Sequence, residues 1–311
     1  MTRITASTRM NHQQSPSCIA LTLYLANLAP SGRRSMRSLL QQVALLNKWQ
    51  GSLEQMPWLT LRYEQVSRIR AALRQSSKSP NTINTTLAAI RGVLKSGFLS
   101  GHFPALEWQR IQGIDRIPGK TLPAGRQLRA TEITRLFKAC QRDSELGIRD
   151  AAIISVLAYA GLRRSELVSL NMEDYCRRNG QLIVREGKGQ RQRELMLPTE
   201  ARTYLRQWLQ DRGSSPGPIF CHLTKDGECH VSQRLSALRV YGIVKGRASE
   251  AGIEPCSPHD LRRTFVTRLL EQGVDFNTAR QLAGHEHIQT TALYDRRHIK
   301  TQRQAMANFC F

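Results

Sequence analysis

The sequence is poor in acidic residues and has no long hydrophobic run. Its 311 residues include 24 Asp and Glu against 46 Lys and Arg, a formal net charge of +22. It contains no unbroken apolar stretch of the ~18 residues that a membrane-spanning helix needs, and its first residues lack the apolar centre of a signal peptide. We therefore expect a cytoplasmic protein that does not associate with membranes.

The cysteines follow no disulfide pattern. There are seven of them, an odd number, and they are scattered along the chain, so we expect reduced thiols. Cys221-His222 and Cys229-His230 form the arrangement closest to a metal site, but their spacing fits no common zinc pattern. We expect no metal and no cofactor.

The positive charge is spread over the whole chain. Residues 1–120 hold 16 basic and 4 acidic residues, and the remainder holds 30 and 20. This balance is typical of a protein that binds a polyanion, and both parts of the chain should contact it. The alternative is a solvated surface of ribosomal or chromatin type, which rarely combines such charge with 40% hydrophobic residues.

Changes in composition divide the chain into five segments. Residues 117–128 contain two Pro and two Gly without periodicity, which indicates a linker. The expected segments are a disordered N-terminus at 1–16, a helical domain at 17–116, the linker at 117–128, a second domain at 129–298 and a tail at 299–311.

The first domain is predicted to be helical, with arginines on its outer faces. Apolar residues at helical spacing predict helices over 19–28, 35–49, 63–75 and 82–96. Basic side chains at the start of a helix gain nothing from its dipole, so an external anion would explain them. For any one arginine, simple solvation of the surface is the alternative. The candidates for contact with the polyanion are Arg33, Arg34, Arg37, Arg68 and Arg91.

The second domain is predicted to be mainly helical with a small antiparallel sheet. Strand-forming residues on both sides of Gly187-Lys188-Gly189 predict a β-hairpin over 181–197 with Lys188 at its tip. Arg163 and Glu166 lie three residues apart, so they share one face of a short helix. Helical patterns cover 131–141, 148–159, 160–170, 200–210 and 232–251.

The stretch from 257 to 297 groups further polar side chains on short helices. Ser257 and Pro258 are start signals for a helix, and His259 and Arg262 lie together on its first turn, where free amides attract an anion. A second helix is predicted over 275–282. Gly284 ends it and is followed by His285, and Tyr294 comes nine residues later.

These residues, in this order, resemble the tyrosine recombinases, also called phage integrases. The motifs are Arg163 in AGLRRSEL, Lys188 in GKG, His259 and Arg262 in SPHDLRRTF, His285 in AGH and Tyr294 in TTALYDR. Each motif is weak alone, and the ordered set is strong. The resemblance is close over about 129–300. It implies a mainly α (α+β) protein, with an N-terminal core-binding domain of SAM-like type and a C-terminal mixed α/β catalytic domain.

The resemblance implies a site-specific DNA recombinase that cleaves and rejoins strands without metal or ATP. Tyr294 would attack the phosphate and form a 3′-phosphotyrosine, which stores the bond energy for rejoining. Arg163, Arg262 and His285 would hold the phosphate oxygens, because planar guanidinium forks match them. His259 would accept the tyrosine proton or bind the phosphate, and Lys188 would protonate the leaving 5′ oxygen. Glu166 would orient Arg163 or His259. Arg164 is the alternative to Arg163.

The same resemblance implies the partners. These are double-stranded DNA recombination sites, a homotetramer on two duplexes that is a monomer or dimer when free, and accessory DNA-bending proteins. The setting would be the nucleoid, and the outcome integration, excision or resolution of a mobile DNA element. We expect the tail at 299–311 to dock on a neighbouring protomer, with docking on its own domain as the alternative. A relaxing type IB topoisomerase and a catalytically silent DNA-binding protein are the other functions to test.

Overall fold

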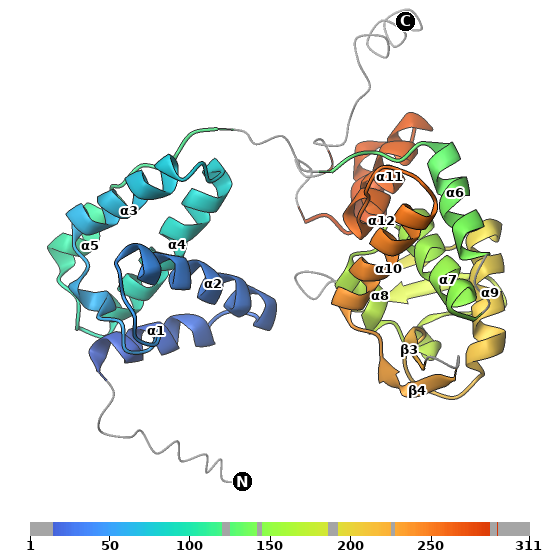
Figure 1. Cartoon of the computed structure of the whole chain (residues 1–311), viewed down its shortest axis with the longest axis horizontal. Helices are drawn as coiled ribbons and strands as arrows, with labels where there is room; N and C mark the ends of the chain where they lie inside the picture. The colour runs from blue at the N-terminus through green and yellow to red at the C-terminus, as the bar shows by residue number, and fades with distance from the viewer. Residues whose placement is uncertain are drawn as a thin grey trace, which may run out of the picture. The chain divides into compact units, whose positions relative to one another are not determined.

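The chain forms two compact units, Met1–Leu122 and Pro123–Phe311 (Figure 1). This computed structural model describes residues 15–119, 125–141, 145–185, 192–224, 228–286 and 291. Within these residues, no helix combines the length and hydrophobicity that crossing a bilayer requires. The boundary between the units falls inside the stretch of Pro and Gly at 117–128.

The first unit is a bundle of helices around α4. Its core is continuous, and the buried side of α4 includes Ile83, Leu87, Ile90 and Leu94. Ser79 caps α4, since its Oγ accepts a hydrogen bond from the amide of Thr82 at 3.2 Å. The predicted helices are present, with ends shifted by a few residues, and α5 was not predicted. The elements are α1 (Pro16–Ala26), α2 (Pro30–Leu46), the 3₁₀ turn η1 (Trp58–Thr60), α3 (Tyr63–Gln75), α4 (Pro80–Leu99) and α5 (Ala105–Gln112).

The second unit has the apolar helix α7 (Glu145–Ala160) at its centre. Ile153, Ile154 and Leu157 of α7 are fully buried, and α6, α9, α10 and α11 pack against this helix. The chain from 125 onward already belongs to this core, because Leu128 is fully buried and its amide donates to Oγ1 of Thr264 at 2.9 Å. The other helices are α6 (Ala130–Cys140), α8 (Arg164–Ser169), η2 (Met172–Asp174), α9 (Thr199–Arg212), α10 (Ala237–Glu250), α11 (Pro258–Glu271) and α12 (Phe276–Ala283).

Two small antiparallel hairpins complete the second unit. The predicted hairpin is present, with β1 (Gln181–Val184) paired to β2 (Arg193–Met196). A second hairpin pairs β3 (Cys221–Leu223) with β4 (Cys229–Arg234), so the prediction that a helix begins at residue 232 is wrong. Ser236 caps α10 by accepting from the amide of Arg239 at 3.1 Å, which starts that helix after the strand. The fold class, mainly α with small antiparallel sheets, is confirmed.

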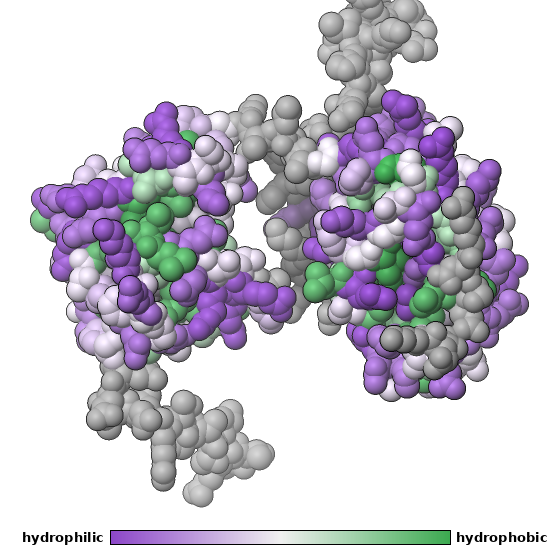
Figure 2. All heavy atoms as spheres, in the orientation of Figure 1, coloured by the Kyte–Doolittle hydropathy of each residue, from purple (hydrophilic) through white to green (hydrophobic). Residues whose placement is uncertain are grey.

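Strand pairing also corrects the prediction of reduced thiols for one pair of cysteines. Cys221 and Cys229 form a disulfide across the β3–β4 hairpin, where their Cα atoms are 6.5 Å apart. Such a pairing depends on the strand register, which the cysteine spacing alone does not define. His222 and His230 lie on the same hairpin, 6.3 Å apart between ring centroids. Figure 2 shows that hydrophilic residues cover much of the visible face of each unit.

Candidate active site

The turn between α7 and α8 places Arg163. Gly161 has a left-handed φ of +59°, and a Cβ there would lie 2.2 Å from the ring of Phe265. The chain can therefore turn at this point only with glycine. Arg163 is the N-cap residue of α8, and its backbone amide donates to Oε2 of Glu166 at 2.8 Å. The guanidinium of the alternative, Arg164, instead lies 5.5 Å from the ring centroid of Tyr241.

Glu166 is the anionic centre of the site. It is 1% exposed, and its carboxylate accepts from Nη1 of Arg163 at 2.5 Å and from both terminal nitrogens of Arg193 at 3.1 and 2.7 Å. Nη1 of Arg262 lies 3.9 Å from Oε2. Burial by itself would raise the pKa of Glu166, but the hydrogen bonds and charges of Arg193 and Arg163 outweigh it and lower the pKa to about 2. The sequence pairing of Arg163 with Glu166 is therefore a direct contact.

Helix α11 brings His259 and Arg262 to the same site. Pro258 occupies its first turn, and Asp260 accepts from the amide of Ser257 at 2.9 Å, as the sequence start signals predict. Arg262 is 3% exposed and donates to the carbonyl of Gly161 at 2.6 Å. The ring of His259 keeps contact with solvent, but partial burial and the nearby cations, chiefly Arg262, lower its pKa. This shift favours the neutral imidazole.

His285 follows the end of α12 and is 5% exposed. Its Nδ1 is 3.0 Å from Oγ1 of Thr291, and the carbonyl of His285 accepts from Nη1 of Arg280 at 3.1 Å. Burial, followed by the charges of Arg262 and Arg163, lowers the pKa of His285 to about 3. A neutral imidazole has one N–H donor, so His285 can donate a hydrogen bond to an anion while remaining uncharged.

Three arginines donate hydrogen bonds to three consecutive carbonyls at the C-terminus of α12. Arg193 donates to Leu282 at 3.2 Å, Arg262 to Ala283 at 2.6 Å and Arg163 to Gly284 at 2.7 Å. The last carbonyls of a helix have no partner within it and carry a partial negative charge. This helix end therefore gathers cations that would otherwise repel one another.

Arg193 is the residue of this cluster that sequence reasoning missed. It lies on β2 with an 11% exposed side chain, 27 residues from Glu166 along the chain. The available signal was strand alternation, because Arg193 lies on the same side of β2 as the buried Leu195. A basic residue on the inward face of a strand requires a buried acidic partner.

The structure brings together Arg163, Glu166, His259, Arg262 and His285. A pocket of about 410 Å³ is lined by Arg163, Arg164, His259 and Arg262 among others, so the site is open to a ligand. Lys188 and Tyr294 lie outside the described residues. Among the residues that the structure does describe, no group of three His, Cys, Asp or Glu side chains is arranged to hold a metal.

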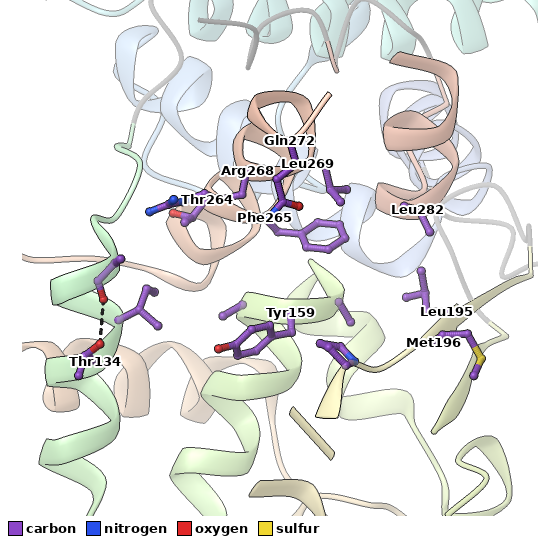
Figure 3. Close-up of a pocket in the computed structure, with 15 residues that line it drawn as sticks. Thr134, Tyr159, Leu195, Met196, Thr264, Phe265, Arg268, Leu269, Gln272 and Leu282 are labelled. Carbon is purple, nitrogen blue, oxygen red and sulfur yellow. Dashed lines mark hydrogen bonds between the residues drawn. The ribbon is translucent and has the colours of Figure 1, made fainter. Parts of the chain in front are cut away.

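A separate apolar groove of about 620 Å³ lies between α6, α7, α11 and β2. Figure 3 shows Phe265 and Leu269 of α11 on one side and Tyr159 and Leu195 on the other. Met196 at the groove is 63% exposed, although it is a large apolar side chain. The groove can accept an apolar segment.

The arginines proposed for the first unit have different surroundings. Arg33 donates from Nε to the carbonyl of Leu25 at 3.0 Å, and Arg91 donates to the carbonyls of Ile111, at 3.2 Å, and Ile114. Both side chains therefore bind helix ends of their own unit, and Arg33 remains exposed. Arg37 pairs with Glu54, and Arg68 lies 3.7 Å from Glu64 with both side chains largely exposed. Arg34 is exposed.

Known proteins similar to this chain identify its family. Residues 126–301 match the model of the Phage integrase family. Tyrosine recombinase XerD of Listeria monocytogenes is 32% identical over 248 residues, which are 76% of this chain and 78% of that protein. Tyrosine recombinase XerC of Pseudomonas fluorescens is 32% identical over 283 residues, 88% of this chain and 90% of that protein.

Solved structures share the fold. The Tn1549 transposon integrase in complex with a circular intermediate DNA gives a TM-score of 0.68 at 18% identity, over 94% of this chain and 99% of that one. A lambda integrase dimer bound to a COC′ core site gives 0.67 at 14% identity, over 90% and 95%. The matched family and the relatives define an enzyme that cleaves and rejoins DNA strands. The chain belongs to the phage integrase family of tyrosine recombinases, and it is a site-specific DNA recombinase.

Proposed function

We propose that Arg163, Arg262, His259 and His285 bind the scissile phosphate of a DNA recombination site. The observation that carries this proposal is their convergence: two guanidinium groups and two histidines of lowered pKa gather around the end of α12. Guanidinium forks match phosphate oxygens geometrically, and they hold their charge at every physiological pH. The fixed hydrogen bonds orient them before the substrate arrives, so little reorganisation is needed during the reaction.

In the proposed reaction, the phenolic oxygen of Tyr294 attacks the phosphorus. The bond from phosphorus to the 5′ oxygen breaks, Lys188 gives that oxygen a proton, and a 3′-phosphotyrosine remains. His259, neutral at the working pH, accepts the proton of the tyrosine. The reverse attack by the 5′ hydroxyl of another strand completes the exchange without an external energy source.

The test uses a suicide DNA substrate with a nick just 3′ to the scissile phosphate. Cleavage then releases the short piece that carries the 5′ hydroxyl, so rejoining is prevented. Wild-type protein should remain attached to the DNA after denaturation, and peptide mapping should find the nucleotide on Tyr294. Tyr294→Phe should abolish the adduct and retain DNA binding. Tyr204→Phe is the matched control, because Tyr204 stacks on Phe137 with ring centroids 4.3 Å apart, away from the arginine cluster. An adduct that persists in Tyr294→Phe would overturn the assignment.

The same proteins and DNA substrates distinguish the recombinase from two other activities. A type IB topoisomerase would relax supercoils through a tyrosyl adduct without exchanging strands between two duplexes. A silent DNA-binding protein would form no adduct at all. Strand exchange between two marked duplexes, measured on gels, is therefore the decisive product.

We also propose that both units contact the DNA. In the first unit, Arg34, Arg37 and Arg68 are the best candidates, because their side chains are exposed or pair only at the surface. Surface ion pairs cost little to break, so Arg37 and Arg68 can exchange a carboxylate for a phosphate. The affinity should fall with salt along a log–log slope of about −0.9 per neutralised phosphate, and each Arg→Ala change should reduce that slope by about one contact.

Strand exchange between two duplexes needs four cuts, so we propose a homotetramer on two DNA sites, with accessory DNA-bending proteins where sites must be brought together. The tail at 299–311 carries Met306, Phe309 and Phe311, and the apolar groove beside α11 suits such a segment. We propose that the tail of one protomer occupies this groove on its neighbour.

Two variants test the docking of the tail. Truncation after Arg303 removes the segment, and Met196→Glu places a charge in the groove at a side chain that is already exposed. Both should weaken assembly on DNA, measured by mass photometry, and retain cleavage of a single suicide site. Assembly that is unchanged in both variants would rule out this docking. Loss of assembly on truncation alone would place the tail elsewhere.

A further inference from the structure

Arg193 uses every nitrogen of its guanidinium on two parts of the site. Its terminal nitrogens hold both oxygens of Glu166, and its Nε donates to the carbonyl of Leu282. With an 11% exposed side chain, it faces protein on most sides. A group so placed acts on the reaction through its neighbours.

Glu166 has limited capacity as an acceptor. A carboxylate offers about four lone-pair directions, and the backbone amide and Nη1 of Arg163 together with the two nitrogens of Arg193 account for four bonds. Arg262 lies just beyond, at 3.9 Å. Without Arg193, two acceptor directions of Glu166 would open towards Arg163 and Arg262. Both would then turn towards the carboxylate, at the expense of the phosphate.

The turn at Gly284 ties the position of Arg193 to that of Arg163. Gly284 has a φ of +65°, and a Cβ at this residue would lie 2.6 Å from Nη1 of Arg193. The carbonyl of the same glycine accepts from Nη2 of Arg163. The next residue is His285, so the contact of Arg193 with the turn also helps to fix the position of that imidazole.

We propose that Arg193 is a positioning residue of the recombinase: by occupying Glu166 and the end of α12, it sets the directions in which Arg163 and Arg262 meet the scissile phosphate. This inference rests on the proposed roles of Arg163 and Arg262. It assigns to β2 a function beyond carrying one side of the hairpin.

The main test is Arg193→Gln, which removes the charge and the fork. The rate of adduct formation in a single turnover on the suicide substrate should fall by ~10- to 100-fold, as when the partners that orient metal ligands are lost. The Kd for the cognate DNA should change by less than a few-fold. Arg193→Lys keeps the charge without the fork, so its rate of adduct formation should lie between those of wild type and Arg193→Gln. If Arg193→Gln does not fold, Arg193→Lys carries the test, and it should still be slower than wild type.

Arg247→Gln is the matched control. Arg247 is also buried and holds Asp150 through Nε at 2.9 Å, outside the arginine cluster. It should cost comparable stability, seen in thermal unfolding, and leave the rate per folded molecule unchanged. A loss of rate in Arg193→Gln that only equals the loss of folded protein, as in the control, would overturn the proposal.

A pH profile and a double variant add readouts that simple destabilisation would not move. The charged groups that face Glu166 are Arg163 at the N-cap of α8, Arg193 on β2 and Arg262 on α11. His259 and His285 are the other titratable groups of the site. Losing Arg193 makes Glu166 easier to protonate, so the acid limb of the rate profile should move to higher pH. In a background of Glu166→Gln, Arg193→Gln should have little further effect. Additive losses would overturn the proposal.

The result with wild-type protein distinguishes a failure of this proposal from a failure of the proposed function. An adduct in wild type that is absent in Tyr294→Phe establishes the function. Equal rates per folded molecule in wild type and Arg193→Gln would then remove the positioning role alone. Absence of the wild-type adduct on its own recombination site would overturn both.

Discussion

Replacing Glu166 with Gln should reveal how much the arginine cluster depends on one negative charge. The carboxyl is 1% exposed, and its pKa falls from an ordinary 4.5 to about 2 in the fold. Each pH unit of such a change is worth roughly 1.4 kcal/mol, so the ionised group contributes about 3 kcal/mol at neutral pH. For a unit of this size, that corresponds to a melting temperature lower by roughly 6–12 °C.

The sign of the pH dependence distinguishes this charge effect from a packing defect. Because the folded state lowers the pKa of Glu166, its contribution is complete above the unfolded value of 4.5 and is lost as the pH falls towards 2. The stability gap between wild type and Glu166→Gln should therefore shrink to roughly half between pH 7 and pH 3. Gln has nearly the same shape as Glu, so little packing should be lost. A packing defect involves no proton, so it would give a stability gap that does not change with pH.

The assay is differential scanning calorimetry of both proteins from pH 7 to pH 3. Only the transition of the second unit should shift, since Glu166 lies in that unit. The variant should also form the phosphotyrosyl adduct more slowly, because Arg163 and Arg193 lose their shared partner. A gap of the same size at pH 3 and pH 7 would refute the electrostatic account of the cluster.

Three further predictions follow from single contacts. Arg262→Lys should lower the rate of adduct formation by ~10²- to 10³-fold in single-turnover assays, because lysine cannot reproduce the fork; a loss below ten-fold would count against its phosphate role. Gly161→Ala should destabilise the protein by more than ~1 kcal/mol in denaturant titrations, since the new Cβ meets Phe265 and the φ is left-handed; unchanged stability would contradict the turn geometry. Arg91→Ala should lower the melting temperature, at a cost of ~1–3 kcal/mol because the carbonyls of Ile111 and Ile114 each lose a hydrogen bond, and leave the Kd for DNA nearly unchanged; weaker DNA binding with normal stability would assign Arg91 to DNA contact.

Local patterns were the reliable part of the prediction. The cap at Ser257, the glycine stop at Gly284 and the face shared by Arg163 and Glu166 depend on neighbours within about four residues, so the sequence displays them directly. The resemblance to the tyrosine recombinases, and not local pattern, grouped Arg163, His259, Arg262 and His285 into one candidate site, and these residues meet in space.

The missed features depend on partners distant in the chain. Arg193 becomes part of the site only because β2 lies beside α8 and the end of α12. The second hairpin has short, largely polar strands, so alternation gave little signal, and the Cys221–Cys229 bridge depends on its register. In the first unit, the hydrogen bonds of Arg33 and Arg91 to helix ends are set by tertiary packing, so the sequence does not display them.

The convergence of Arg163, Arg193 and Arg262 on three successive carbonyls makes the last turn of α12 a common mount for the site. Unwinding that turn would remove one hydrogen bond from each of the three guanidinium groups at once, while their bonds to Glu166 and to the carbonyl of Gly161 would remain. The orientation of all three guanidinium groups therefore depends on the end of one short helix.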